Sequence, residues 1–282
     1  MEIFKNLTIV LVTFRSKEKL KILLNSLDRR FKVLVIENSK NYKYEKSLFK
    51  NKKIEIVYSS INKGFGTALN FAINKKIKTK LALYLSADVK ITNNQIHSMY
   101  SQSKKVNKFS VITSKIKNEN FSKYVIEQEN KNLSKVTYAN GCVMLIDTKI
   151  FKKLKGFDEK IFLYYEEIDF FKRSYINNYS IYLNHNITVQ QQKGKSIDSK
   201  YLNDYLILRN WHYSWSKFYY YKKYHNYLFA FRKTFVNLRR SIFGLIKNII
   251  LFNYKEFKMN FAELSGLFSS YLNLKSYKRL KI

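Results

Sequence analysis

The chain has 282 residues, 46% of them hydrophobic, which is enough for one large domain with a packed core and excludes an intrinsically disordered protein. Its single cysteine, Cys142, excludes an internal disulfide framework and is typical of a reducing compartment. Lys and Arg number 53 against 20 Asp and Glu, and the formal charge of +33 implies an anionic partner: nucleic acid, anionic lipid or a nucleotide-diphosphate substrate.

Short apolar runs alternate with helical patterns in the first half of the chain, which predicts a mostly parallel α/β sheet. We expect strands at 7–14, 33–36, 54–58 and 81–85, with helices at 18–27 and 68–77. The run at 7–14 is too short to span a bilayer and no signal peptide is visible, so we expect a cytoplasmic protein.

Polar or glycine-rich residues follow these strands: Glu37-Asn38-Ser39, Asn62-Lys63-Gly64-Phe65-Gly66 and Ser86-Ala87-Asp88. In a parallel sheet, ligands bind beyond the carboxyl ends of the strands. We therefore expect these residues to converge on one crevice.

The second half predicts strands at 143–146, 179–183 and 187–190, and a helix at 148–154 that ends at Gly156. From about residue 201 onward, the pattern changes to long helices rich in Tyr, Phe, Lys and Arg. We expect a catalytic domain at 1–218 and a helical tail at 219–282.

The tail interleaves apolar and basic residues, and its longest uncharged run, 248–254, is far too short to span a bilayer. This mixture is typical of a helix that lies in the headgroup plane of an anionic membrane. The alternative is a helical hairpin packed on the catalytic domain.

Three carboxylates, Glu166, Glu167 and Asp169, stand at the start of a helix predicted to run to about Tyr175. Glu166, Asp169 and Arg173 share a helix face and can form an ion network, whereas Glu167 lies about a quarter turn away. The carboxylates could simply stabilise the helix start through its dipole. A cluster of acids in so basic a chain favours a general base instead.

In this order, the motifs resemble those of family 2 glycosyltransferases, closest to the rhamnosyltransferase-like enzymes of bacterial surface polysaccharides. The resemblance runs from about Leu7 to Lys217. It implies a GT-A fold: a Rossmann-like, mostly parallel mixed sheet flanked by helices, here with a C-terminal helical extension.

The resemblance assigns nucleotide-sugar binding to the strand ends and to later loops. Val12-Thr13-Phe14-Arg15 resembles the first-strand motif, with Arg15 where the family usually has Asn, and Glu37 replaces the commoner Asp at the nucleobase. Glycines in the third loop permit a tight turn near a phosphate. The full set is Thr13, Phe14, Arg15, Glu37, Asn38, Asn62, Gly64, Gly66, Asn70, Lys193, Lys195, Ser196 and Arg209.

The segment Ser86-Ala87-Asp88 resembles the family's metal motif, in which only the last carboxylate is retained. Because Mg²⁺ is often held by one or two carboxylates with substrate phosphates, Asp88 is the expected ligand of Mg²⁺ or Mn²⁺. Ser86 and Gln191 are further candidate ligands, although Gln191 replaces a His of the family motif. Gly141 and Cys142 resemble the acceptor-side motif.

The resemblance implies an inverting transfer from a nucleotide-diphospho-sugar, with a rhamnose-like deoxyhexose favoured. Glu167 takes the position of the catalytic base, and Glu166 and Asp169 are further catalytic candidates. The expected acceptor is a polyprenyl-diphosphate-linked saccharide of O-antigen or capsule synthesis, on the inner face of the cell membrane.

Two other functions remain open. The departures at Ser86 and Gln191 allow a catalytically degenerate glycosyltransferase that acts as a scaffold. The charge and the many aromatic residues also suit a nucleic-acid-binding protein. No nucleic-acid-binding motif is visible, and we expect no nucleic-acid partner.

Overall fold

The computed structural model describes residues 2–45, 49, 53–191 and 201–280, and it divides the chain into two compact units. The sheet unit comprises Met1–Phe157 and Phe170–Asp198, and the helical unit comprises Asp158–Asp169 and Ser199–Ile282. The boundary expected at residue 218 falls inside helix α7 (Leu202–Tyr224). This helix belongs entirely to the helical unit because it packs against the two helices that follow it.

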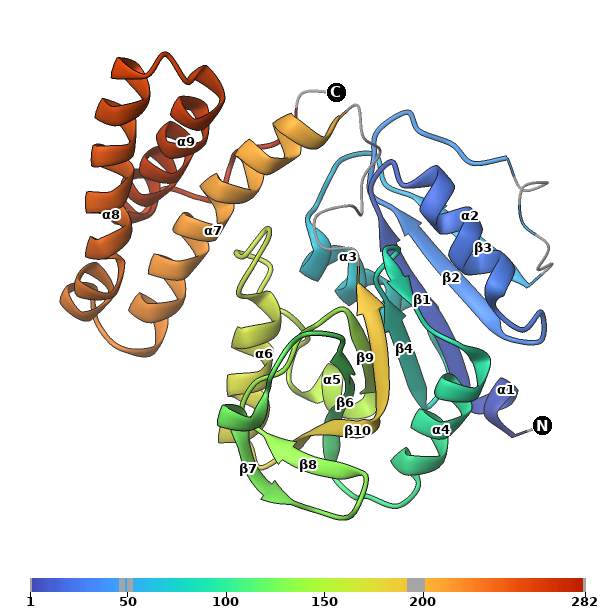
Figure 1. Cartoon of the computed structure of the whole chain (residues 1–282). Coiled ribbons are helices and arrows are strands. Elements are labelled where there is room, and N and C mark those ends of the chain that lie inside the picture. The colour runs from blue at the N-terminus through green and yellow to red at the C-terminus, as the bar shows by residue number, and fades with distance from the viewer. Residues whose placement is uncertain (1, 46–48, 50–52, 192–200, 281–282) are drawn as a thin grey trace. The chain divides into compact units, whose positions relative to one another are not determined.

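The strands of the sheet unit, as far as it is described, form one mixed 10-stranded sheet (Figure 1). Their spatial order is β3-β2-β1-β4-β9-β6-β10-β8-β7, with β5 paired to β10. The strands are β1 (Leu7–Thr13), β2 (Lys32–Glu37), β3 (Ile54–Tyr58), β4 (Leu81–Leu85), β5 (Val89–Lys90), β6 (Phe109–Ile116), β7 (Val125–Gln128), β8 (Leu133–Val136), β9 (Val143–Asp147) and β10 (Ser180–Gln191).

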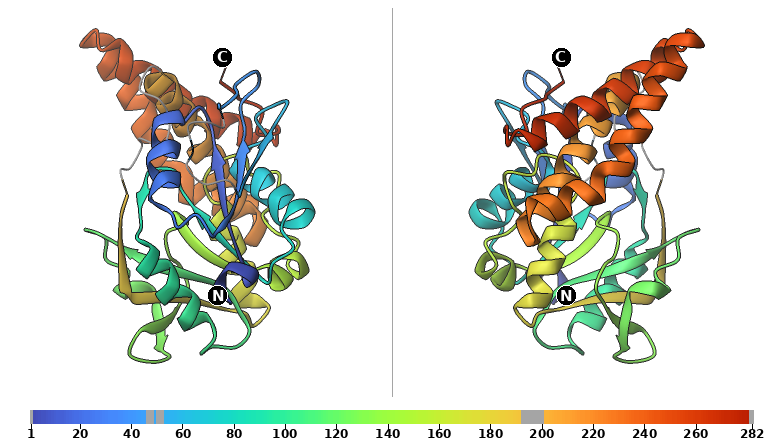
Figure 2. Two further views of the ribbon diagram at one scale, coloured as in Figure 1. Left: turned by 90° about the vertical axis from the view of Figure 1, so that its right-hand side faces the viewer. Right: turned by 90° about the vertical axis from the view of Figure 1, so that its left-hand side faces the viewer.

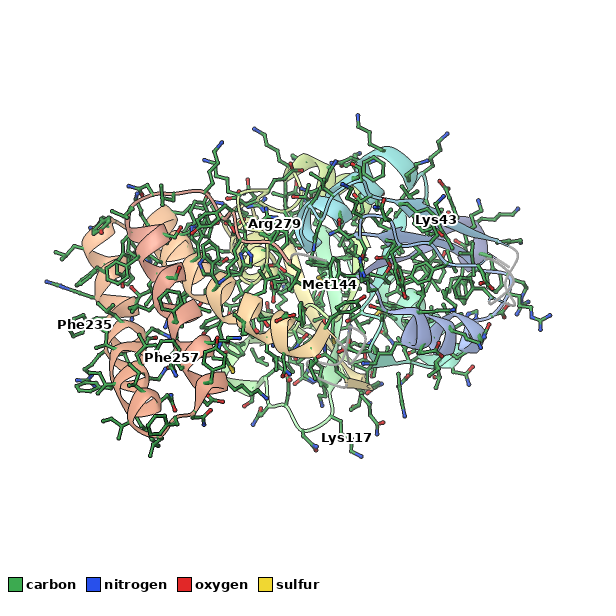
Figure 3. All side chains as sticks on the ribbon, turned by 90° about the horizontal axis from the view of Figure 1, so that it is seen from above. Lys43, Lys117, Met144, Phe235, Phe257 and Arg279 are labelled. Atoms are coloured by element: carbon green, nitrogen blue, oxygen red, sulfur yellow. The ribbon has the colours of Figure 1, made fainter. Side chains whose placement is uncertain are left out.

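The four strands predicted in the first half are β1 to β4, and the parallel pairing of β1 with β2 and β4, and of β2 with β3, confirms the predicted parallel sheet. β1 and β4 read as continuous apolar runs because both faces of these strands are buried. Met144 on β9 lies in this interior (Figure 3).

Helices cover both faces of the sheet: α2 and α4 lie on one face, and α3 and α5 on the other (Figure 2). The helices of this unit are α1 (Ile3–Asn6), α2 (Lys17–Ser26), α3 (Phe65–Phe71), α4 (Asn93–Ser103) and α5 (Thr148–Lys153), and α3 continues into a π-helical turn at Ala72–Lys76. The last helix, α6 (Glu166–Ile176), begins in the helical unit and ends in the sheet unit.

The prediction of two strands at 179–183 and 187–190 was wrong, because β10 is one continuous strand. Its pairing with β6 shifts register between Asn184 and Thr188, where polar residues interrupt the apolar pattern. Helix α4, strand β6 and the hairpin of β7 and β8 were not predicted from the sequence. A capping box of Thr92 and Gln95 is a signal that could have revealed the start of α4.

The helical unit contains α7, α8 (Tyr227–Ile250) and α9 (Tyr254–Tyr271), which confirms the long helices expected after residue 201. The side chains of Asn226 and Asn253 cap α8 and α9 by accepting hydrogen bonds from main-chain N–H groups. Among the described residues, no helix combines the length and apolar character needed to span a bilayer.

Candidate active site

Glu37, at the end of β2, is fully buried and joins the ends of two strands to the following loop. Its Oε2 accepts hydrogen bonds from the hydroxyls of Thr13, at 2.8 Å, and of Tyr44, and its Oε1 accepts one from the Arg15 N–H at 3.1 Å. Burial and the adjacent carboxylate raise the pKa of Tyr44, which therefore keeps its proton and donates. The structure shows Glu37 as an internal organiser, and its contact with a nucleobase stays a prediction.

Arg15 and Phe14 follow β1 and are half-buried. Arg15 has a φ of +49°, and its guanidinium lies 5.5 Å from the centre of the Tyr42 ring. The left-handed backbone at a non-glycine residue is uncommon and is often found at functional sites.

Asn38 fixes the loop that precedes α3. Its Nδ2 donates to Asn62 Oδ1 at 2.9 Å and to the Gly64 carbonyl at 3.1 Å, and its Oδ1 accepts from the Lys63 N–H. Gly64 has a φ of +82°, a conformation that glycine adopts without strain, and Gly66 is buried in the first turn of α3. The predicted convergence of the second and third strand ends is therefore confirmed.

Asn70 has a different role from the one that the resemblance implies. It is buried, its Nδ2 donates to the Phe157 carbonyl at 2.9 Å, and its Oδ1 accepts from the Phe157 N–H at 2.8 Å. A Cβ at Gly156 would lie 2.3 Å from Asn70 Oδ1. With both ends of its amide occupied by main chain, Asn70 positions the 156–157 segment rather than a nucleotide sugar.

The candidate metal ligands Ser86 and Asp88 follow β4, and the third, Gln191, ends β10, which pairs with β5 directly after Asp88. The Ser86 hydroxyl donates to Asp88 Oδ1 at 2.5 Å, and the main chain of Gln191 pairs with Val89, directly after Asp88. Among the described residues, no group of three or more His, Cys, Asp or Glu side chains is placed to hold a metal.

The oxygen atoms of Ser86, Asp88 and Gln191 suit Mg²⁺ or Mn²⁺ when substrate phosphates complete the coordination. Cys142, a predicted acceptor-side residue, adjoins Ser86, because the Ser86 N–H donates to the carbonyl of Cys142 at 2.9 Å. Cys142 is buried and Gly141 is half-exposed. Lys193, Lys195 and Ser196 lie outside the described residues.

In the helical unit, an unusual backbone leads into α6. Tyr164 and Tyr165 have φ values of +65° and +70°, and both immediately precede Glu166. The Arg209 guanidinium donates to the Tyr164 hydroxyl, so the structure places Arg209 at this turn. Two successive non-glycine residues in left-handed conformations store strain, which is typical of sites where geometry is enforced.

Glu166 is buried and Glu167 half-buried, and the Oε2 atom of each is shielded from solvent. Within the described part of the chain, neither of these Oε2 atoms has a hydrogen-bond partner. Burial, together with the neighbouring Glu167 carboxylate, raises the pKa of Glu166 well above its ordinary value, and burial raises the pKa of Glu167. Such a pair holds a proton at a higher pH than solvated carboxylates do.

Asp169, the third carboxylate, is fixed inside the helical unit. Its Oδ1 lies 2.5 Å from Lys223 Nζ and accepts a hydrogen bond from the Tyr224 hydroxyl at 2.8 Å. Lys223 also binds Asp158 at 2.7 Å, so it links two acidic residues to α7. This arrangement favours a structural role for Asp169 over the predicted catalytic one.

A cavity of about 870 Å³ lies within the helical unit. Its wall is aromatic, with Phe162, Trp215 and Tyr219, and basic side chains such as Lys222 and Lys275 also line it. Trp215 and Tyr219 are stacked, with their ring centres 5.1 Å apart. The combination suits an apolar group that carries an anion.

Comparison with known proteins identifies the fold. The mannosyltransferase PcManGT from Pyrobaculum calidifontis, in complex with GDP-Man and Mn²⁺, matches 95% of this chain and 87% of its own with 11% identity and a TM-score of 0.58. A 1–349 form of S. aureus TarS in complex with UDP-GlcNAc matches 95% of this chain and 92% of its own, with 13% identity and a TM-score of 0.53. The chain has the GT-A fold.

One curated relative adds sequence similarity. The chain is 24% identical over 197 residues to the low-salt glycan biosynthesis hexosyltransferase Agl10 of Haloferax volcanii. The alignment covers 62% of this chain and 64% of Agl10, so it spans slightly less than two thirds of that relative. No family model matches the chain.

Some residues that hold the predicted site residues in place were not predicted from the sequence. Tyr44, Tyr164 and Lys223 each bind a predicted site residue, but the chain has 23 Tyr and 53 Lys plus Arg, and nothing in the pattern distinguishes Tyr44 or Lys223. The signal available for Tyr164 was its place in the aromatic run before the carboxylates.

Proposed function

We propose that the chain is an inverting glycosyltransferase that moves a sugar from a nucleotide-diphospho-sugar to a hydroxyl of a lipid-linked saccharide. The observation that carries the proposal is the set of polar residues at the strand ends of a GT-A sheet, where Ser86 donates a hydrogen bond to Asp88 and Gln191 pairs through its main chain with Val89. Similarity to a hexosyltransferase, and to structures that hold GDP-Man or UDP-GlcNAc, supports it.

In this proposal the sheet unit binds the donor. Asn38 and Glu37 hold the loops at the strand ends in one conformation, so that main-chain N–H groups and Arg15 receive the nucleotide without rearrangement. Mg²⁺ or Mn²⁺ held by Asp88, with Ser86 and Gln191 as further oxygen donors, would stabilise the negative charge that develops on the leaving diphosphate.

The Glu166 and Glu167 pair supplies the base. With raised pKa values, the pair retains a proton at a pH where ordinary carboxylates have lost theirs, and its ionised member is a stronger base than a solvated carboxylate. We assign removal of the acceptor proton to Glu167, because its side chain is only half-buried whereas that of Glu166 is buried.

The proposed acceptor is a polyprenyl-diphosphate-linked saccharide of surface polysaccharide synthesis, and the proposed place of action is the inner face of the membrane. The aromatic and basic lining of the 870 Å³ cavity supports an acceptor with an apolar chain and a phosphate. A rhamnose-like deoxyhexose remains the favoured sugar on the motif resemblance.

The test is nucleotide release from a panel of nucleotide sugars with Mg²⁺ or Mn²⁺, comparing the wild type with Glu167→Gln and Asp88→Ala. Glu256→Gln, at an exposed carboxylate on α9, is the matched control. The proposal would be supported if the wild type and the control release nucleotide from one donor and both site variants do not.

A second function is a catalytically inactive scaffold, favoured by the single carboxylate at the candidate metal site and by its hydrogen bond to Ser86. Calorimetric titration separates the two functions. If no donor binds and none is turned over, the transferase proposal fails and the scaffold takes its place.

A further inference from the structure

Helix α8 has its polarity reversed relative to an ordinary surface helix. The side chains that it buries are small or polar and recur at intervals of three, four or seven residues: Ala230, Thr234, Asn237, Ser241 and Asn248. The side chains that it exposes are large and apolar: Leu228, Phe235, Val236, Ile242, Phe243, Ile246, Ile249 and Ile250. A water-facing helix normally shows the opposite pattern. Figure 3 shows Phe235 on the outer side of the helix.

The buried face of α8 is held by close approach and by hydrogen bonds. Asn237 Nδ2 donates to Glu263 Oε1 of α9 at 2.8 Å, and the Thr234 and Tyr271 hydroxyls lie 3.0 Å apart. A Cβ added at Gly244 would lie 2.4 Å from Asn260 Oδ1. Small residues and polar contacts between helices, with apolar residues outward, characterise helix pairs that are surrounded by lipid.

The turn between α8 and α9 continues the apolar surface. Leu251 and Tyr254 are exposed, and Phe252 is 93% exposed, the largest value among the exposed large hydrophobic side chains. Phe252 has a φ of +51°, so the chain reverses at this residue and carries its ring outward. Exposure of a full aromatic ring in water is unfavourable, and the turn is well suited to enter an apolar phase.

Exposed cations accompany this surface. Arg232, Lys233, Arg239, Arg240 and Lys247 are exposed on α8, and Lys255 and Lys258 on α9. After residue 225 the acidic residues are Glu256 and Glu263, and Glu263 is buried and paired with Arg240. Long basic side chains can pack their stems along apolar surface while their charges reach lipid phosphates.

We propose that the outer face of α8 and the 251–254 turn insert as a unit into the headgroup and upper acyl region of an anionic bilayer. The helix lies on the membrane without crossing it, because five cations along its length oppose a span. This proposal rests on the proposed function and specifies which surface of the chain contacts the membrane. A second copy of the chain fits this face less well than lipid does. Arg232 and Arg239 lie among the apolar residues, and in a dimer they would face the same positive charges of the other copy.

The experiment is co-sedimentation of the full chain with vesicles of phosphatidylcholine, or of equimolar phosphatidylcholine and phosphatidylglycerol. We compare the wild type with a Phe243→Ser and Ile250→Ser double variant. The matched control is Ile22→Ser with Ile126→Ser, two exposed apolar positions of the sheet unit. Thermal unfolding confirms that each variant folds, and no sugar donor is present, so failure here is distinct from failure of the transferase proposal.

We expect the wild type to prefer the anionic vesicles and to lose part of its binding in high salt. The α8 double variant should bind at least about tenfold more weakly, since two large side chains no longer enter the bilayer, and the control should stay within about twofold of the wild type. In a Phe252→Trp variant, quenchers attached to the lipids should reduce the fluorescence that the new tryptophan contributes.

Equal vesicle binding by the wild type and the α8 double variant would overturn the proposal. So would a lipid-free dimer, seen by light scattering, that the same double variant converts to a monomer, because a second copy would then occupy this face.

Discussion

Glu37 of the sheet unit and the Glu166 and Glu167 pair of the helical unit have buried carboxylate oxygens with opposite hydrogen bonding. In the sheet unit, both oxygens of Glu37 accept hydrogen bonds, from Thr13, Tyr44 and the Arg15 N–H. In the helical unit, Glu166 and Glu167 each keep a buried oxygen for which the described residues provide no donor. The first arrangement stabilises an ionised group, and the second disfavours it.

The difference indicates which carboxylates hold the structure and which are available for chemistry. A buried charge that is fully hydrogen-bonded contributes to rigidity. A buried carboxylate with an unsatisfied oxygen costs stability, and such a cost is most often retained at sites that move protons. Four predictions test this division.

Replacing Glu167 with Gln should reduce sugar transfer by about 10³-fold, because the amide cannot accept the acceptor proton. Donor affinity should change by less than about twofold. Steady-state kinetics with calorimetry of the donor would measure both, with Glu256→Gln as the control. An active Glu167→Gln enzyme would remove this residue from the mechanism.

Replacing Glu37 with Ala should lower the free energy of unfolding by about 3 kcal/mol, since three donors lose a charged acceptor inside the protein. Urea denaturation would show the change, and Glu55→Ala at an exposed position of β3 serves as the control. A loss as small as that of the control would mean that Glu37 is not the organiser of the strand ends.

Replacing Tyr44 with Phe removes one of those donors and leaves the ring. We expect a loss of about 1–2 kcal/mol in the free energy of unfolding, because Glu37 retains its other two hydrogen bonds. Tyr175→Phe, at an exposed tyrosine of α6, should be neutral. If the Tyr44 and Glu37 substitutions proved additive, the two side chains would not act as one network.

Replacing Glu166 with Gln should stabilise the protein, and only above acidic pH. The pKa of Glu166 is raised in the folded state, so the folded protein binds more protons than the unfolded chain. Below the ordinary carboxyl pKa of 4.5, Glu166 is protonated in both states and its contribution to stability is fully present. That contribution is lost as the pH rises through the raised pKa of the folded state. The variant avoids that loss.

Thermal unfolding of the wild type and the Glu166→Gln variant from pH 4 to 8 would follow this difference. We expect the curves of Tm against pH to separate in favour of the variant as the pH increases. Parallel curves would show that Glu166 is ionised as easily in the folded protein as in water.

The parallel strands β1 to β4 were predictable because they are apolar runs followed by polar residues. The pairing of β5 with β10 could not be predicted, since it joins Val89 to Gln191 across about a hundred residues. That pairing places the main chain of Gln191, the third candidate ligand, beside the residue that follows Asp88. Long-range pairing of this kind depends on tertiary structure and leaves no signal in single-sequence periodicity.

The reversed polarity of α8 exposes a second limit of sequence reasoning. The spacing of Phe235, Ile242 and Ile249 correctly indicates a two-sided helix, but periodicity does not say which side is buried. The buried positions became apparent from contacts such as that of Asn237 with Glu263. Similarly, nothing in the sequence showed that Asp169 is paired with Lys223 while its neighbours Glu166 and Glu167 keep an unsatisfied oxygen.

The contact between Asn70 and the 156–157 segment also constrains how this protein can diverge. An aspartate at position 70 could not donate to the Phe157 carbonyl, and any side chain at position 156 would collide with the Asn70 amide. Neither position can change alone without loss of the turn. Among homologues, asparagine at 70 and glycine at 156 should therefore be inherited as a pair, and a lineage that has lost one of them should have lost the other.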